Sequence, residues 1–225
     1  MTPSPKRPLP SVHITVDVVI FTVHEGRLQV VLIKRTNEPF TGQWALPGGY
    51  LQEGERSAQS AERILATKAG VEGVYLEQLY TFDTPERDHR GRTVSISYFA
   101  LVPVTKLAFS GADVQQPTLH PVDQLPPLAF DHADIVRYAV SRLQAKLEYT
   151  NAIMSLLPAA FSLSELQQAY ETVLARPLDK RNFQKKFLSL GLIEPTEELR
   201  TGGKHRPARL YRFVDDQPTA LKKFF

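Results

Sequence analysis

Two segments near the start of the chain alternate apolar and polar residues and then merge into apolar runs. The first covers His13–Val23 and the second is the stretch LQVVLIKR, with the turn His24-Glu25-Gly26-Arg27 between them. Alternation with a period of two predicts a strand, and a continuous apolar run predicts a strand that is buried on both faces. The pattern therefore predicts a β-hairpin that belongs to a buried sheet.

Breaker residues and helical spacing organise the next part of the chain. Glu38–Tyr50 is rich in Pro and Gly and predicts a loop. Ser57–Ala69 has apolar residues at helical spacing and is followed by the stop signal Gly70, so it predicts a helix. The other expected elements are strands at Val74–Phe82 and Thr93–Val104, an irregular Pro-rich segment at Pro103–Pro127, and a helix from the N-cap Asp131 to about Leu147 with Asp134 in its first turn.

After Thr150 the pattern becomes that of short helices. One is expected to end at Pro158, and the capping box Ser162-x-x-Glu165 opens a second at Leu163–Leu174. A third, Lys180–Leu190, follows Asp179 and carries apolar residues at a spacing of i, i+4 and i+7. The stretches LIEPTEELR and ARLYRFV predict two strands of a hairpin. Three short helices followed by a hairpin are typical of a winged helix-turn-helix.

The length and composition fit a folded protein of two small domains. The chain has 225 residues, of which 42% are hydrophobic and 23% charged. The absence of cysteine excludes disulfides, Cys-ligated metal and thiol catalysis. We expect an α/β (α+β) fold divided into a flexible Pro-rich tail at 1–12, a mixed-sheet domain at 13–148 and a winged helix-turn-helix domain at 149–225.

No segment approaches the roughly 20 apolar residues of a membrane-spanning helix. The opening MTPSPKRPLP also lacks the apolar core and the cleavage site of a secretion signal. We therefore expect a cytoplasmic protein that has no membrane partner.

Charge is distributed unevenly between the two predicted domains. The net charge is +3, but residues 151–225 hold twelve Lys or Arg against eight Asp or Glu, while residues 1–150 are nearly neutral. The range Arg176–Arg212 contains ten basic residues and four acidic ones. A concentrated positive charge predicts a polyanionic partner, and the alternative is a basic surface that is merely solvated.

Six residues in the first domain keep the spacing of a known phosphate-handling motif. They are Gly49, Glu55, Arg63, Leu65, Gly70 and Val71. In this register the chain resembles the Nudix family of nucleoside-diphosphate hydrolases over about His13–Leu147, which implies a Nudix-type mixed-sheet sandwich. In that family, a helix presents carboxylates that hold divalent metal on the diphosphate.

This copy of the motif departs from the family at the metal ligands. Ile64, Thr67 and Lys68 stand at three of the four glutamate positions, and only Glu55 remains. Glu62 lies one residue before a motif position, so its side chain points about 100° around the helix from the direction in which it could bind the metal. We therefore expect no catalytic residues, no metal and no required cofactor, and a chain that is not an enzyme.

A second segment, Phe82–Arg92, resembles the ADP-ribose pyrophosphatase branch of the same family, where it lies beside the substrate. Guanidinium groups bind phosphate bidentately, and carboxylates accept from ribose hydroxyls. The predicted ADP-ribose-binding residues are Arg35, Phe40, Trp44, Gly48, Gly49, Glu55, Arg63, Phe82, Arg87, Asp88, Arg90 and Arg92. The alternative is that the aromatic residues belong to the core and the arginines to a solvated loop.

The third helix and the hairpin tip of the second domain have the composition of a DNA-binding surface. Phe183 and Phe187 anchor one face of the helix and leave long cationic and amide side chains on the other. The predicted DNA-binding residues are Lys180, Arg181, Asn182, Gln184, Lys185, Lys186, Thr201, Gly202, Lys204, His205, Arg206 and Arg209. The alternative is a dimerisation module with an exposed basic face.

Joined in one chain, these halves resemble the NrtR group, the Nudix-related transcriptional regulators of NAD metabolism. The resemblance implies a homodimeric repressor of NAD biosynthesis or salvage genes that binds a palindromic double-stranded operator and releases it when ADP-ribose binds. Two alternatives stay open: a working ADP-ribose pyrophosphatase with an accessory winged helix, in which Glu53, Glu55 and Glu62 hold metal, or a repressor that responds to a sugar.

Overall fold

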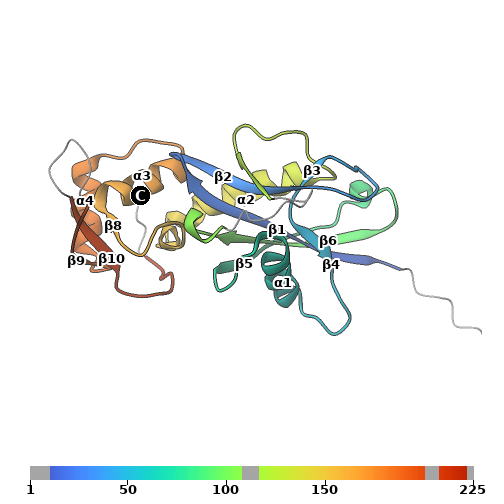
Figure 1. Cartoon of the computed structure of the whole chain (residues 1–225), viewed down its shortest axis with the longest axis horizontal. Coiled ribbons are helices and arrows are strands. Elements are labelled where there is room, and N and C mark those ends of the chain that lie inside the picture. Colours follow the sequence, from blue (N-terminus) through green and yellow to red (C-terminus); the bar gives the residue numbers. More distant parts are fainter. Residues whose placement is uncertain (1–10, 108–116, 201–207, 222–225) are drawn as a thin grey trace, which may run out of the picture.

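The computed structural model describes residues 11–107, 117–200 and 208–221. The predicted tail at 1–12 thus lies almost wholly outside the described residues. The molecule is elongated, with a large mixed sheet and α1 at one end and a group of short helices on a small sheet at the other (Figure 1). None of the helices in the described ranges combines the length and the apolar character that a bilayer crossing requires.

The large sheet is built around the predicted hairpin. Its strands β1 (His13–His24) and β2 (Arg27–Lys34) are antiparallel and are joined by a tight turn in which Gly26 has a φ of 70°. Strand β6 (Thr93–Leu101) runs parallel to β1, and β5 (Tyr75–Phe82) pairs antiparallel with β6 at the edge. This arrangement places β1 at the centre of the sheet, as its apolar sequence predicts.

Three short strands lie in segments that the sequence predicts to be irregular. Strand β3 (Trp44–Ala45) pairs with β2, and β4 (Gly48–Tyr50) pairs with β1, both inside the predicted loop. Strand β7 (Thr118–Pro121) pairs with β2 inside the predicted Pro-rich segment. Each is held by a partner that is distant in sequence, so local composition does not reveal it.

One helix covers each face of the large sheet. Alternate residues of β1 point to opposite faces, so Val18 and Ile20 pack with α1 (Ser57–Ala69), whereas Val19 and Phe21 lie in the same buried cluster as α2 (His132–Leu147). Helix α1 has the predicted bounds, and Gly70 ends it in the left-handed conformation with a φ of 63°.

The start of α2 differs from the expectation in one respect. Asp131 occupies the N-cap position, but its side chain makes no capping hydrogen bond. Its carboxylate instead accepts two hydrogen bonds from Arg87. A buried guanidinium is a stronger partner than a backbone N–H, and it takes the carboxylate away from the cap.

The second domain confirms the predicted winged helix-turn-helix: α3 has its predicted bounds, and α4 and the two hairpin strands differ from theirs by one residue at one end. A strand pair that was not predicted, between β8 and β10, completes a three-stranded sheet of order β8-β10-β9. The elements are a 3-10 helix at Ala152–Leu156, β8 (Phe161–Ser162), α3 (Leu163–Leu174), α4 (Lys180–Ser189), β9 (Ile193–Arg200) and β10 (Ala208–Phe213). The predicted capping box is present, because Ser162 Oγ accepts from the Glu165 backbone and Glu165 Oε2 accepts from the Ser162 backbone.

A single buried cluster runs through the junction of the two domains. It includes Phe21 of the large sheet, Leu143 of α2 and Tyr170 of α3. Hydrogen bonds between residues distant in sequence also cross this junction: Gln144 Nε2 donates to the Val173 carbonyl at 3.0 Å, and the Thr172 hydroxyl donates to the Gly26 carbonyl at 3.3 Å. Helix α2 therefore contacts the sheet on one side and α3 on the other.

Candidate functional site

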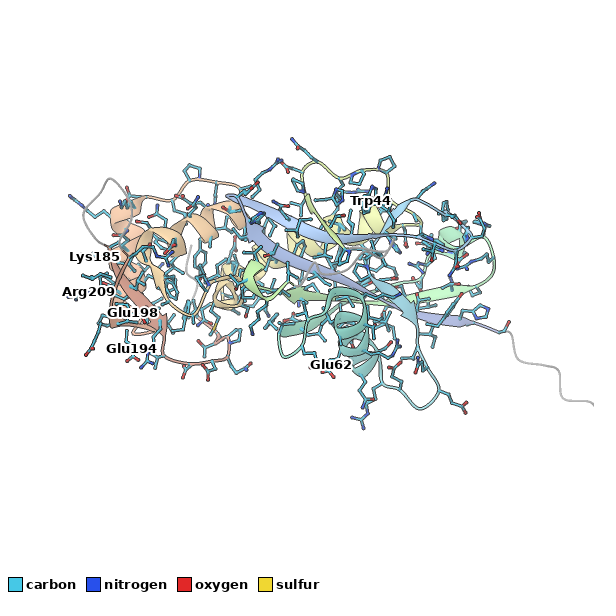
Figure 2. All side chains as sticks on the ribbon, viewed as in Figure 1. Trp44, Glu62, Lys185, Glu194, Glu198 and Arg209 are labelled. Atoms are coloured by element: carbon cyan, nitrogen blue, oxygen red, sulfur yellow. The ribbon has the colours of Figure 1, made fainter. Side chains whose placement is uncertain are left out.

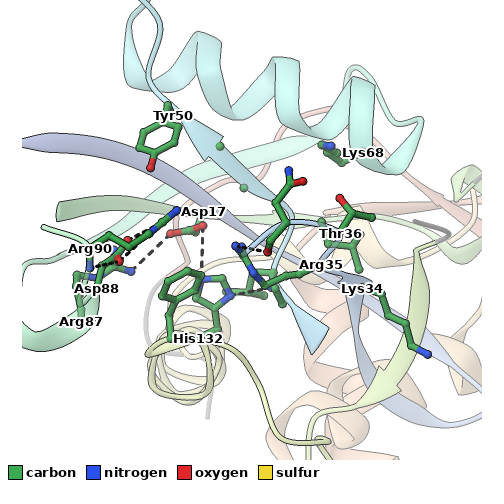
Figure 3. Close-up of a pocket in the computed structure, with 17 residues that line it drawn as sticks. Asp17, Lys34, Arg35, Thr36, Tyr50, Lys68, Arg87, Asp88, Arg90 and His132 are labelled. Atoms are coloured by element: carbon green, nitrogen blue, oxygen red, sulfur yellow. Dashed lines mark hydrogen bonds and ion pairs between the residues drawn. The ribbon is translucent and has the colours of Figure 1, made fainter. Parts of the chain in front are cut away.

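A polar pocket opens between α1, the β3–β4 connection and the start of α2 (Figure 3). Strand β1 supplies Asp17 to its wall, the end of β2 supplies Arg35, and the segment after β5 supplies Arg87, Asp88 and Arg90. Residues from six separate parts of the chain meet here because the parallel pair β1–β6 and the short strand β4 bring their ends to one end of the sheet.

The floor of the pocket is a buried network of charged side chains around Arg87. Its side chain is only 4% exposed, and Nη2 lies 2.7 Å from Asp131 Oδ1 and 3.7 Å from Asp17 Oδ2. Asp17 Oδ2 also accepts a hydrogen bond of 2.6 Å from the hydroxyl of Ser95 on β6. Burial of charge is tolerated because each group has a charged or hydrogen-bonding partner. The network fixes the start of α2 to the pocket floor.

His132, the first residue of α2, is held as a neutral imidazole in this network. The backbone N–H of Leu46 donates to its Nδ1 at 2.9 Å, so Nδ1 carries no proton. Its Nε2 lies 3.7 Å from Asp17 Oδ1. Burial lowers the pKa of His132, against the opposing effect of Asp17 and Asp131. The neutral ring therefore ties the β3–β4 connection to α2 and β1.

Two arginines at the mouth of the pocket differ in how they are held. Arg90 donates to both carboxylate oxygens of Asp88, at 3.0 and 2.7 Å, and these bonds lower the pKa of Asp88. Within the described part of the chain, Arg35 donates to the carbonyls of Pro39 and Asn37, and its guanidinium lies 4.7 Å from the ring centre of Phe130. Burial and the charge of Arg90 lower the pKa of Arg35. Arg35 is thus a cation without an ion-pair partner within 4 Å among the described residues.

Gly48 lets the pocket floor approach the backbone of β4. A Cβ atom at this position would lie 2.1 Å from Asp17 Oδ1, closer than any real contact. The adjacent Gly49 has open space on its Cβ side, with no atom within 4 Å. The pair of glycines therefore has two functions: the first accommodates the buried carboxylate, and the second leaves room in the pocket.

The structure brings together half of the predicted ligand residues. Those that line the pocket are Arg35, Gly48, Gly49, Arg87, Asp88 and Arg90. The other six are not among the lining residues. Phe40 packs on Phe130, Trp44 packs on His120, and Phe82 packs with Tyr80 and Tyr138. Glu55 and Arg63 pair with each other, and Arg92 donates to the Asp83 carbonyl. Their ligand roles stay predictions.

Sequence reasoning missed several lining residues. Asp17, Phe130 and His132 are among them, together with Lys34, Thr36, Tyr50 and Lys68. Asp17 carried a usable signal, because a lone carboxylate inside the apolar run VDVVIF must be buried and therefore paired. His132 carried none, because its partners come from distant strands.

The residues of the Nudix-type motif do not fit a divalent metal. Ile64 is 1% exposed and packs in the core beneath α1, and the hydroxyl of Thr67 donates to the Arg63 carbonyl. Within the described ranges no group of three or more His, Asp or Glu could hold a metal ion. Glu62 is exposed on α1 (Figure 2) and is not among the residues that line the pocket.

The remaining motif glutamate is engaged with the motif arginine. Arg63 Nε donates to Glu55 Oε1 at 2.7 Å, and Arg63 Nη2 donates to Glu55 Oε2 at 2.9 Å. These hydrogen bonds lower the pKa of Glu55 to about 2. The Glu55–Arg63 pair therefore braces the segment before α1.

Helix α4 presents the predicted DNA-binding side chains to solvent. Phe183 and Phe187 are buried, and their rings lie 5.5 Å apart and pack on Tyr170. The opposite face is exposed at Lys180, Arg181, Asn182, Lys185 and Lys186, with Gln184 half-buried. Asp179 caps the helix by accepting from the Asn182 backbone at 2.8 Å. The burial of one aromatic face thus aims the cationic face outward.

In the described strands of the hairpin, part of the positive charge counted from the sequence is paired with carboxylates. Arg212 pairs with Glu194 at 2.6 Å and Arg200 with Glu165 at 2.9 Å, which compensates two of the counted cations. Arg209 is exposed and lies at the same end of the molecule as Lys185 (Figure 2). The predicted contacts Thr201, Gly202, Lys204, His205 and Arg206 fall outside the described residues.

Comparison with known proteins matches both parts of the chain to family models. The model of the NUDIX domain matches residues 12–139, and the model of the NrtR DNA-binding winged helix domain matches residues 153–213. The chain is 39% identical over 214 residues to the ADPR-responsive transcriptional repressor NtrR of Acinetobacter baylyi, covering 93% of this chain and 85% of that protein.

Two solved structures of Shewanella oneidensis NrtR are also similar. The complex with a 27mer DNA superposes with a TM-score of 0.82 at 36% identity, covering 89% of this chain and 93% of that chain. The NUDIX domain complexed with ADP-ribose superposes with a TM-score of 0.56 at 38% identity, covering 63% of this chain and 94% of that chain.

Proposed function

The chain belongs to the NrtR family of Nudix-related regulators, and from this premise we propose that it is a transcriptional repressor that responds to ADP-ribose. The Nudix domain binds ADP-ribose, and the winged helix binds operator DNA. The observation that carries this function is the combination, in one chain, of a cationic pocket that does not fit a catalytic metal and an outward-facing cationic helix.

The pocket offers suitable groups to each part of the ligand. Arg35 and Arg90 supply charge for the diphosphate, and the open side of Gly49 allows the ligand to approach the backbone. Asp88 presents carboxylate oxygens that can accept from ribose hydroxyls, in competition with Arg90. The fit is to a nucleoside diphosphate sugar, and the homologous ADP-ribose complex supports that ligand over a simple sugar.

Helix α2 connects the ligand to the DNA. Its first turn is fixed to the pocket floor through Asp131 and Arg87, and Gln144 near its other end binds the Val173 carbonyl of α3. Tyr170 of α3 in turn packs on Phe183 of the DNA-binding helix, with ring centres 5.5 Å apart. A ligand that engages Arg87 changes the anchoring of α2. Ligand and operator then favour different placements of the domains, so each weakens the other by the same factor.

The remaining parts of the proposal follow from the family. The chain does not hydrolyse ADP-ribose, it acts in the cytoplasm on genes of NAD biosynthesis or salvage, and it binds a palindromic operator as a homodimer. The division into a ligand domain at 13–148 and a DNA-binding domain at 149–225 is part of the same proposal.

An operator-binding titration tests the regulatory function. Duplexes selected from a randomised library on the immobilised full chain provide the probe, and an enriched inverted repeat supports the dimer. Saturating ADP-ribose should weaken binding about 5- to 150-fold, the usual range of allosteric coupling. Unchanged affinity at saturating ADP-ribose would exclude regulation by this ligand.

A separate incubation tests the enzymatic alternative. The full chain is mixed with ADP-ribose and magnesium, and AMP and ribose 5-phosphate are measured by chromatography. We expect neither product above a protein-free blank. Rapid formation of both products would show that the chain is a hydrolase and would contradict the metal-free assignment.

A further inference from the structure

One lining residue of the pocket stands where the motif of the hydrolases has a metal-binding glutamate. Lys68 lies in the last turn of α1, and its side chain is part of the pocket wall. Figure 3 shows it on the α1 side of the pocket, with Thr36 and Arg35 on the side of the sheet. The substitution thus places an ammonium group next to the space where the ligand binds.

The charge of the pocket as a whole is that of an anion site. Its ionisable lining residues are the cations Lys34, Arg35, Lys68, Arg87 and Arg90 and the carboxylates Asp17 and Asp88. Both carboxylates are already paired: Asp17 contacts Arg87 and His132, and Asp88 binds Arg90. Positive charge therefore exceeds negative charge before any ligand or metal enters.

We infer that Lys68 takes over the electrostatic part of the role that a divalent metal has in hydrolases of this fold. Its ammonium group, with Arg35 across the pocket, binds the diphosphate of ADP-ribose directly, and the site needs no metal to hold its ligand. The inference rests on the proposed ADP-ribose binding. It gives a ligand-binding role to Lys68, whereas in the motif this position counts only as a missing metal-binding glutamate.

An ammonium group can supply charge but not the chemistry of the metal. It neutralises phosphate oxygens and donates up to three hydrogen bonds, but it has no coordination sites for the attacking water. The replacement therefore separates binding from cleavage. A pocket of this kind retains an intact diphosphate, which a sensor requires.

A charge series at position 68 tests the inference. ADP-ribose affinity is measured by calorimetry on the full chain for Lys68→Arg, Lys68→Gln and Lys68→Glu, each in EDTA and in magnesium chloride. Loss of a charged hydrogen bond weakens binding by about tenfold to a hundredfold. We expect Arg to bind like the wild type, Gln to bind at least tenfold more weakly, and Glu to bind more weakly still.

The controls separate this role from a structural one. Lys106→Ala removes an exposed cation that does not line the pocket and should bind ADP-ribose like the wild type. The melting temperature of each variant without ligand shows whether it folds. If Gln binds as tightly as Lys, or if the wild type binds only with magnesium, the inference is wrong. If the wild type binds no ADP-ribose under either condition, the proposed function fails instead.

Discussion

The pocket and helix α4 both present several cations, but Arg87 and Arg90 in the pocket are held differently from the exposed cations of α4. In the pocket, Arg87 is buried and paired with two carboxylates, and Arg90 is paired with a third. On α4, Lys180, Arg181 and Lys185 are exposed and have no carboxylate within 4 Å among the described residues.

The difference reflects what each surface has to recognise. A small ligand is recognised by fixed geometry, and fixed geometry requires partners that hold each side chain in place before binding. A nucleic acid backbone presents repeated charge, so mobile cations that release counterions are sufficient for affinity. We therefore expect the pocket to respond mainly to changes of packing, and α4 to changes of salt.

The largest effect is expected from removal of the central pocket cation. Arg87→Ala leaves the buried Asp17 and the partly buried Asp131 without their arginine partner and should reduce the free energy of unfolding by about 3–5 kcal/mol, measured by urea denaturation. The control Arg137→Ala breaks the exposed pair with Asp134 and should cost at most about 1 kcal/mol. An equal loss of unfolding free energy in the two variants would show that the buried, paired arginine contributes no more to stability than the exposed one.

A smaller effect is expected from a single methyl group in the pocket floor. Gly48→Ala forces its Cβ against Asp17 and should destabilise the fold by about 1–3 kcal/mol, with a loss of ADP-ribose binding. The neighbouring variant Gly49→Ala has free space and should unfold at nearly the wild-type urea concentration. Similar destabilisation of both variants would show that Asp17 does not restrict position 48.

On the other surface, loss of one cation should change salt dependence but not stability. Lys185→Ala should weaken operator binding several-fold and reduce the slope of log affinity against log salt by about 1, as measured by fluorescence anisotropy. Lys106→Ala serves as the control, because it removes an exposed cation outside α4. An unchanged slope for Lys185→Ala would show that α4 does not face the DNA backbone.

The smallest effect is expected from the titration of His132. Because its pKa is lowered in the folded state, the unfolded chain takes up the proton first as pH falls. The stabilisation is complete above the ordinary histidine pKa of about 6.5 and is lost progressively below it. Urea denaturation between neutral pH and about pH 5 measures the loss. In His132→Gln this part of the pH dependence should be absent; if the variant keeps it, another group is responsible.

Local signals in the sequence predict the long elements correctly. The bounds of α1 follow from its helical spacing and from Gly70, and the hairpin β1–β2 follows from alternation and a glycine turn. The helix α4 and its aromatic face follow in the same way. In each case the information lies within a few neighbouring residues.

The parts that could not be predicted depend on contacts between distant segments. Strand β7 exists because β2 offers an edge nearly a hundred residues away. Asp131 has the sequence of a helix cap, but Arg87 binds it. Lys68 is visible in the sequence as a departure from the motif, yet only the fold shows that it lines the pocket.

The uninterrupted core through α2 has a consequence for how the molecule melts. Since the same buried cluster holds residues of the sheet, of α2 and of α3, neither half can lose its packing without exposing the other. Calorimetry should record one cooperative transition, although the chain carries two family modules. ADP-ribose bound in the pocket stabilises the folded state as a whole. It should therefore delay proteolytic digestion of α4, although α4 does not contact the ligand.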